Sequence, residues 1–266
     1  MVNCQENEKL VKHRILEAAK QEFAEMGFQG ARTSRIASEA QVNKAMIHYY
    51  FKDKEGLYKE VLRIVFGVNE NAMAPILSKN WDISLPVKLH AILYFLFKVF
   101  TEAVDNYFIS FFFWELVETK QYLSRYVPEY VVPKLKAVKS IIDEGLEEGI
   151  FETENSKLLV ANLFYFPMIY VAKNRLYSGR NIDPEKTFFG EDTAESVFSF
   201  HLSLIFKALC PSGRKLAIPE LPSDLKEMLD SLIEFMVISK QEGNAFKIIN
   251  QLEKILTSKN IKEGKK

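Results

Sequence analysis

The chain has 266 residues, and 48% of them are hydrophobic, which is enough apolar mass for a folded core. The length favours two unequal domains. The 35 basic and 35 acidic residues cancel, which excludes a basic footprint for nucleic acid spread over the whole chain. Any DNA-binding site must therefore be a local patch.

The cysteines and the apolar runs indicate the compartment and exclude several classes of site. Cys4 and Cys210 lie far apart, and no Cys/His cluster has zinc spacing, so we expect no metal and no cofactor. The N-terminal residues lack the apolar core of a signal peptide. The longest uncharged apolar run, residues 158–172, is too short to span a bilayer. These features predict a cytoplasmic protein without a membrane partner.

Apolar residues recur at helical spacing along most of the chain, and hairpin signals are absent, so the sequence predicts an all-α protein. The break signals are Gly27 as a helix C-cap and Thr33, Asn43 and Asp53 as N-caps. The expected helices cover residues 9–26, 34–40, 44–51, 54 towards 73, 84–104, 106–119, 128–148, 153–177, 190–209, 223–240 and 244–258.

Residues 33–51, TSRIASEAQVNKAMIHYYF, read as two short helices around the polar break QVN. This pattern is typical of a helix-turn-helix, whose second helix enters the major groove of DNA. Ile36, Ala37 and Ile47 are the expected inward-facing residues. Residues 29–54 contain five basic and two acidic residues, which gives a local surplus of positive charge for phosphate contact.

This region resembles the N-terminal part of the tetracycline-repressor-like (TetR) family of transcriptional regulators. The resemblance covers about the first sixty residues, with the family's spacing throughout. The residues that carry it are Ile15 to Ala19, Phe23, Gly27, Thr33 to Ala37, Ala40, Val42, Lys44, Ile47, Tyr50, Phe51 and Lys54 to Leu57. It implies an N-terminal three-helix DNA-binding domain followed by a larger helical domain for ligand binding and dimerisation.

The resemblance also implies which residues contact DNA. Thr33 and Lys54, at helix starts, would meet phosphates, while Lys44 and Tyr49 would face base edges. The alternative is that the basic residues are simply solvated and that the tyrosines pack. The predicted DNA-binding residues are Arg32, Thr33, Ser34, Asn43, Lys44, Ala45, Met46, His48, Tyr49 and Lys54.

His48 departs from the family, which usually has a tyrosine there, with a hydroxyl that commonly meets a phosphate. An imidazole can donate from a ring nitrogen, and it gains charge near pH ~6.5 in an unperturbed site. One hypothesis is therefore that His48 contacts the DNA backbone and that mild acidification raises the affinity. The other is a packed, neutral histidine.

The region after residue 75 is rich in aromatic residues, and the resemblance implies a ligand pocket between its helices. An apolar, aromatic lining with few polar groups suits such a pocket, although an aromatic stripe also suits a plain core. Glu115 or Glu118 would suit a cationic ligand, and the plainer interpretation of both is surface placement. The predicted ligand-binding residues are Tyr107, Phe111, Trp114, Asn162, Tyr165 and Tyr170.

Family members dimerise through the last two helices of the standard domain, which here suggests residues 153–177 and 190–209. The same faces could instead pack inside one subunit. The apolar series on the second helix comprises Ala194, Val197, Phe198, Leu204, Ile205 and Ala208, with His201 among them. The predicted domains are 1–52 for DNA binding, 53–210 for ligand binding and dimerisation, and 211–266 as a C-terminal helical extension of undecided role.

The sequence thus predicts a ligand-responsive transcriptional regulator, most often a repressor in such families. A homodimer would bind a pseudo-palindromic operator and release it when a small, largely apolar or aromatic molecule binds. An enzyme is disfavoured because the common phosphate-loop, dinucleotide, zinc-protease and nucleophile-elbow motifs are absent. The remaining alternative is a helical interaction or sensor protein that does not bind an operator.

Overall fold

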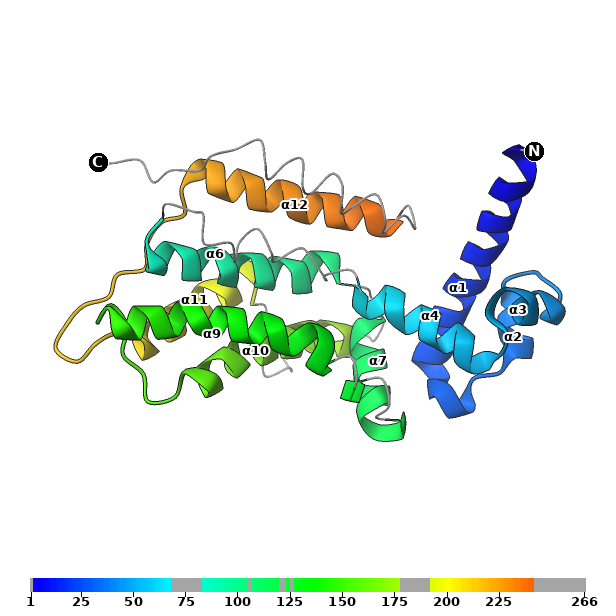
Figure 1. The fold of residues 1–266 in the computed structure, drawn as a ribbon, viewed down its shortest axis with the longest axis horizontal. Helices are drawn as coiled ribbons and strands as arrows, with labels where there is room; N and C mark the ends of the chain where they lie inside the picture. The colour runs from blue at the N-terminus through cyan, green and yellow to red at the C-terminus, as the bar shows by residue number, and fades with distance from the viewer. Residues whose placement is uncertain are drawn as a thin grey trace. The chain divides into compact units, whose positions relative to one another are not determined.

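The computed structural model describes residues 2–67, 83–104, 107–119, 123–124, 127–177 and 192–241. Over these ranges every regular element is helical and no strand occurs, which confirms the all-α prediction (Figure 1). The chain divides into two compact units, one of residues 1–70 and 104–129, the other of residues 71–103 and 130–266. No helix in the described ranges is long and apolar enough to cross a membrane.

The first unit, called the head below, gathers the N-terminal helices and a later segment around one core. Its helix α1 packs against α2, α4 and α7. The side chains at the centre of this core, all buried, are Ile15, Phe23, Ile36, Ile47, Leu57, Tyr58 and Phe111. The elements are α1 (Val2–Gly30), α2 (Thr33–Glu39), α3 (Lys44–Phe51), α4 (Lys54–Gly67), α7 (Phe108–Trp114) and the π-helical turn η2 (Glu115–Thr119).

Most of the helix breaks predicted for this region are present in the head. Gly27 interrupts α1 with φ 66° and ψ 179°, a conformation that favours glycine because a Cβ would clash. The Asn43 side chain accepts a hydrogen bond from the Ala45 nitrogen, which confirms it as an N-cap. The Asp53 Oδ1 accepts from the Gly56 nitrogen at 2.7 Å, as a capping carboxylate does.

The predicted N-cap at Thr33 is wrong by one residue. Arg32 is the N-cap, with extended φ −121° and ψ 124°, and Thr33 is the first helical residue. A tertiary contact accounts for the difference: the Glu22 carboxylate of α1 accepts a hydrogen bond from the Arg32 nitrogen at 3.0 Å. The start of α2 is thus fixed from α1 rather than by a local hydroxyl.

The second unit, called the C-terminal body below, is built around α6, which packs against α9, α10, α11 and α12. Its predicted helices are confirmed where the structure describes them, although π-helical turns replace α-helix at two ends. The expected helix 244–258 and the end of the helix from residue 54 towards 73 lie outside the described residues. The elements are α6 (Leu85–Lys98), η1 (Val99–Ala103), α9 (Val132–Glu147), α10 (Ser156–Tyr177), α11 (Ala194–Ala208) and α12 (Ser223–Gln241); η3 (Val127–Val131) precedes α9.

Helix α12, from the predicted C-terminal extension, runs alongside α6 and packs on α6 and η1 (Figure 1). The Tyr94 hydroxyl of α6 donates to Asp230 of α12 at 2.5 Å, and His90 Nδ1 donates to the carbonyl oxygen of Pro219 at 2.7 Å. One apolar face of α12 is fully buried: Leu225, Met228, Leu229, Leu232, Ile233 and Met236. Helix α12 of the extension therefore contributes one apolar face to the core of the body.

Candidate nucleic-acid interface

Helix α3 has one face anchored in the head core and one face open to solvent. Ile47 and Phe51 are buried in the head core, which holds the helix on its support. On the other side, Lys44 and Ala45 are exposed and Tyr49 has 71% of its surface exposed. A large aromatic side chain left in solvent, on the same helix as an exposed lysine, suits contact with a nucleic acid. Met46 is half-buried and packs on the core edge.

The start of α2 supplies a second group of predicted contact residues. Arg32 and Ser34 are exposed and Thr33 is half-buried at the beginning of this helix. Arg35 is also exposed, and its Nε lies 3.2 Å from Glu22 Oε2. Glu22 is buried and serves both Arg35 and the Arg32 nitrogen, so one carboxylate orders this basic edge. The role of Glu22 is not predictable from the sequence, because nothing local distinguishes it from a surface glutamate.

The Lys54 ammonium already has interaction partners inside the head. Its Nζ lies 3.4 Å from the Gln29 carbonyl oxygen and 4.8 Å from the centroid of the Phe28 ring. Burial lowers the pKa of the Lys54 ammonium, and the charges of Glu118 and Glu22 oppose that shift. A phosphate contact by Lys54 would have to compete with these partners.

The segment after residue 106 contributes to the head through its polar groups. The Trp114 Nε1 donates to the Ala24 carbonyl oxygen at 3.0 Å. Glu115 is completely buried, and its carboxylate accepts from the Tyr58 hydroxyl at 2.8 Å and from the Leu123 nitrogen at 3.4 Å. The surface placement expected for Glu115 is therefore wrong, because the Tyr58 hydroxyl offers a buried donor from α4.

Glu118 binds the backbone next to the α1 kink. Its Oε2 accepts from the nitrogens of Phe28 at 2.9 Å and of Gln29 at 3.3 Å. The kink at Gly27 frees these amides from regular helix bonding, and the carboxylate satisfies them. A Cβ added to Gly27 would lie 2.7 Å from Glu118 Oε1, so the absent side chain makes room for this contact.

The six predicted ligand-binding residues do not share one unit. Phe111 is buried against Tyr58 in the head, Trp114 bonds to α1, and Tyr107 packs at the edge of the same core. Packing therefore accounts for these three side chains. Asn162, Tyr165 and Tyr170 belong to α10 in the body.

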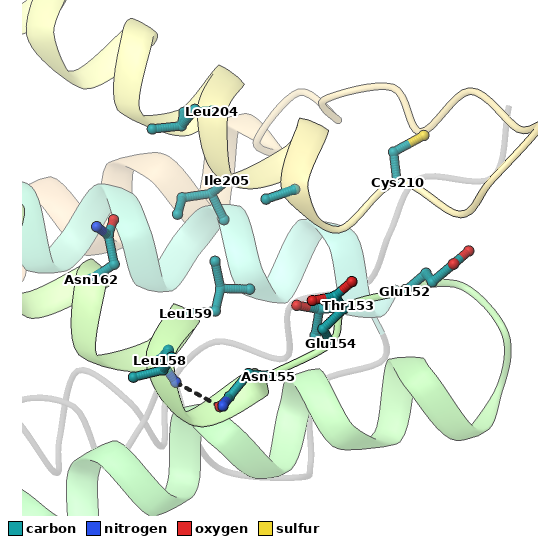
Figure 2. Close-up of a pocket in the computed structure, with 11 residues that line it drawn as sticks. Glu152, Thr153, Glu154, Asn155, Leu158, Leu159, Asn162, Leu204, Ile205 and Cys210 are labelled. Atoms are coloured by element: carbon teal, nitrogen blue, oxygen red, sulfur yellow. Dashed lines mark hydrogen bonds between the residues drawn. The ribbon is translucent and has the colours of Figure 1, made fainter.

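In the body, a cavity of about 540 Å³ lies where α10 begins and α11 ends (Figure 2). Asn162 borders it, and its Oδ1 lies 3.2 Å from His201 Nε2. Tyr165 is exposed and Tyr170 packs on Phe97, so neither lines this cavity. The lining residues are Glu152, Thr153, Glu154, Asn155, Leu158, Leu159, Asn162, Leu204, Ile205, Ala208 and Cys210. Among the described residues, no group of three or more His, Cys, Asp or Glu side chains could hold a metal ion.

Sequence comparisons single out the head. Residues 15–61 match the family described as bacterial regulatory proteins, tetR family. Over 51 residues the chain is 51% identical to the HTH-type transcriptional repressor SCO4008 of Streptomyces coelicolor, covering 19% of this chain and 27% of that protein. Over 57 residues it is 44% identical to the HTH-type transcriptional regulator RutR of Escherichia coli, covering 21% and 27%. The chain thus spans about a quarter of the length of these relatives.

Longer matches extend into the body at lower identity. The HTH-type transcriptional repressor NicS of Pseudomonas putida is 26% identical over 159 residues, covering 57% of this chain and 73% of that protein. A TetR-like transcriptional regulator from Rhodococcus sp. RHA1 superposes with a TM-score of 0.53 at 16% identity, covering 74% of this chain and 94% of that one. A linker mutant of HlyIIR superposes with a TM-score of 0.52 at 23% sequence identity. The match covers 72% of this chain and 95% of that one. The structural matches show a common fold.

An exposed recognition helix, anchored on a short supporting helix by buried apolar residues, defines a helix-turn-helix DNA-binding protein. The family match covers these helices. Residues 15–61 thus match the tetR family of bacterial regulatory proteins, and this match supports a TetR-family transcriptional regulator.

Proposed function

We propose that the protein is a ligand-responsive transcriptional regulator, acting as a repressor, that binds a pseudo-palindromic operator as a homodimer. The observation that carries the proposal is α3, where Ile47 anchors the helix while Lys44, Ala45 and Tyr49 stay open to solvent. The named relatives are regulators and repressors of transcription. No enzymatic activity is proposed.

In the proposed complex, α3 and the start of α2 contact different parts of the DNA. The exposed side chains of α3 read base edges, while the start of α2 and the His48 ring contact the DNA backbone. Asn43 acts through its cap on α3. The proposed DNA-binding residues are Arg32, Thr33, Ser34, Asn43, Lys44, Ala45, Met46, His48, Tyr49 and Lys54.

The proposed dimer forms through α10 and α11, whose exposed apolar side chains support it. Leu204 and Phe200 of α11 are 44% and 65% exposed, which is costly for side chains of this size unless a partner covers them. Phe198 does not belong to this face, because it packs on His90, Tyr94 and Phe97 within the body. The exposed large hydrophobic residues of α10 are Leu158, Tyr165 and Ile169.

A small, largely apolar or aromatic molecule is proposed as the effector. The volume of the α10–α11 cavity lies within the usual range for small-molecule sites, roughly 300–1,000 Å³. Its lining is apolar at Leu158, Leu159 and Ile205. Its polar groups include the amides of Asn155 and Asn162 and the side chains of Glu152, Thr153 and Glu154. An effector that shifts the operator affinity must bind the DNA-free and DNA-bound forms with different affinity.

The test is selection of bound fragments from the source genome by the purified protein at two salt concentrations. A palindromic motif, bound much more weakly at the higher salt, is expected because phosphate contacts dominate the affinity. Lys44→Ala should lose the motif, whereas Lys9→Ala, which removes an exposed lysine of α1 outside the helix-turn-helix, should keep it. The absence of any enriched sequence would favour a sensor protein that does not bind an operator.

A further inference from the structure

The His48 ring is tied to the end of its own helix. Its Nδ1 lies 2.7 Å from the Lys52 carbonyl oxygen, and the Lys52 nitrogen donates to the His48 carbonyl oxygen at 3.0 Å. Lys52 ends α3 with a positive φ of 67°, which turns its carbonyl back towards the ring. The two residues are thus held together by a side-chain bond and a backbone bond.

The Lys52 carbonyl oxygen determines which ring nitrogen of His48 carries a proton. A carbonyl oxygen only accepts hydrogen bonds, so Nδ1 must be the donor. A neutral imidazole has a single N–H, and Nε2 is then an acceptor. A DNA phosphate oxygen is also an acceptor, so neutral His48 has nothing to donate to it. Protonation adds both a hydrogen on Nε2 and a positive charge.

The surroundings leave Nε2 open. The His48 side chain is exposed, and its hydrogen bond to Lys52 is local to α3. In the part of the chain that the structure describes, no carboxylate forms an ion pair with His48. The charged groups on α3, on the turn that follows it and on the packed helices α2 and α4 are Lys44, Lys52, Asp53, Arg35, Glu39, Lys54, Glu55, Lys59, Glu60 and Arg63. Several already have partners: Arg35 has Glu22, Glu55 has Lys59, and Glu60 has Arg63.

We propose that His48 is a protonation-gated contact to the DNA backbone: only the imidazolium, with Nδ1 held by Lys52, can donate from Nε2 to a phosphate. The proposal rests on the proposed DNA-binding function and adds a regulation to it. The operator affinity then rises as the pH falls through the range in which imidazoles titrate. A tyrosine at this position would donate its hydroxyl at every pH in that range.

The first test is the tautomer of His48 in the free protein, read from ¹⁵N shifts of the ring nitrogens by NMR. At about pH 8, where imidazoles are neutral, the expected species carries its proton on Nδ1. A proton on Nε2 would overturn the proposal, because the neutral ring could then donate to a phosphate without being charged.

The second test is binding to a short duplex of arbitrary sequence at fixed ionic strength, since phosphate contacts do not depend on the operator. From about pH 8 to about pH 6 the wild-type affinity should rise roughly five- to tenfold. The slope of log affinity against log salt should steepen by about 0.9 for each head. His48→Tyr should bind with a flat pH profile. His13→Gln removes the exposed histidine of α1 and should keep the wild-type rise.

The outcomes separate this proposal from the function on which it rests. Duplex binding with the same pH profile in wild type and His48→Tyr would overturn the gating and leave DNA binding intact. An affinity that falls on acidification would overturn it in favour of Nε2 accepting from a base amino group. No duplex binding by either protein at either pH would overturn the proposed function, and the gating with it.

Discussion

The Oε2 atom of Glu118 lies 2.9 Å from the backbone nitrogen of Phe28, 90 residues earlier in the chain. This contact joins η2 to the end of α1, two residues upstream of the turn into α2. The recognition elements therefore depend on a carboxylate that lies outside residues 15–61, the segment that matches the family.

Glu118→Ala should lower the free energy of unfolding by about 1–3 kcal/mol, because it leaves the Phe28 and Gln29 amides without their acceptor. Glu118→Gln keeps one acceptor oxygen and should lose less. Denaturant unfolding measures both. Glu8→Ala, at an exposed position of α1, is the control and should match wild type. Equal stability of Glu118→Ala and wild type would mean that water replaces the carboxylate.

Tyr58→Phe should destabilise the head by about 1–3 kcal/mol, because the buried Glu115 carboxylate loses the donor 2.8 Å away. A double-mutant cycle with Glu115→Leu, which removes the acceptor, separates this hydrogen bond from the other contacts of the two side chains. The coupling energy, measured by denaturant unfolding, should be at least about 0.5 kcal/mol. Strictly additive single mutants would contradict the contact.

Gly27→Ala should destabilise the protein by about 1 kcal/mol or more, since φ is +66° and the new Cβ would meet Glu118. Gly30→Ala, three residues later in α1, is the matched control. Its Cβ would meet Met26 at 3.4 Å, an ordinary contact, and its φ is not positive. Thermal unfolding of the two variants should therefore differ, with Gly30→Ala equal to wild type or slightly more stable.

Stability should fall on acidification because of His201. Burial lowers the pKa of His201 to about 4, below its ordinary 6.5, and its ring stacks on Phe166 at 4.1 Å between centroids. The unfolded chain therefore takes up a proton first, so the loss begins as the pH drops through 6.5 and is complete below 4. The loss amounts to at most about 3 kcal/mol. Above pH 6.5 this residue contributes no pH dependence.

His201→Gln keeps a polar group near Asn162 but does not titrate. Urea unfolding of wild type and variant at about pH 7 and about pH 5 isolates the contribution of His201 to stability. The carboxylates and the other histidines are common to both proteins. The wild type should lose more stability than the variant over this interval. Equal losses would show that the folded protein takes up the proton without cost.

Local chemistry made the helix-turn-helix predictable. Asn43 caps α3 through a bond to a residue two positions away, and Ile36 and Ile47 are buried as their helical spacing indicates. Tertiary contacts were not predictable in the same way. The N-cap of α2 is Arg32 rather than the predicted Thr33, because Glu22 accepts a hydrogen bond from the Arg32 nitrogen. Glu115 is buried because a hydroxyl from α4 meets it, and its sequence neighbours contain no sign of that donor.

The aromatic residues after residue 75 could not be assigned to a pocket or to the core for the same reason. The sequence left Phe111 and Trp114 open as pocket or as core residues, with core the plainer interpretation. Their partners, Tyr58 and the Ala24 carbonyl oxygen, lie inside the head. Lys54 kept its predicted place at the start of α4, but its ammonium contacts Phe28 and Gln29. Helical spacing predicts which face of a helix is buried, and it does not predict which distant segment covers that face.

The participation of residues 107–119 in the head limits how this protein can be recombined. A chimaera that joined residues 1–70 to the sensor of another regulator would lose the acceptor for the Phe28 amide, the partner of the Tyr58 hydroxyl and the indole bonded to Ala24. Transferring this head therefore requires two grafted segments, residues 1–70 and 104–129, and hence three junctions in the chain, so that the later segment travels with the helices it completes.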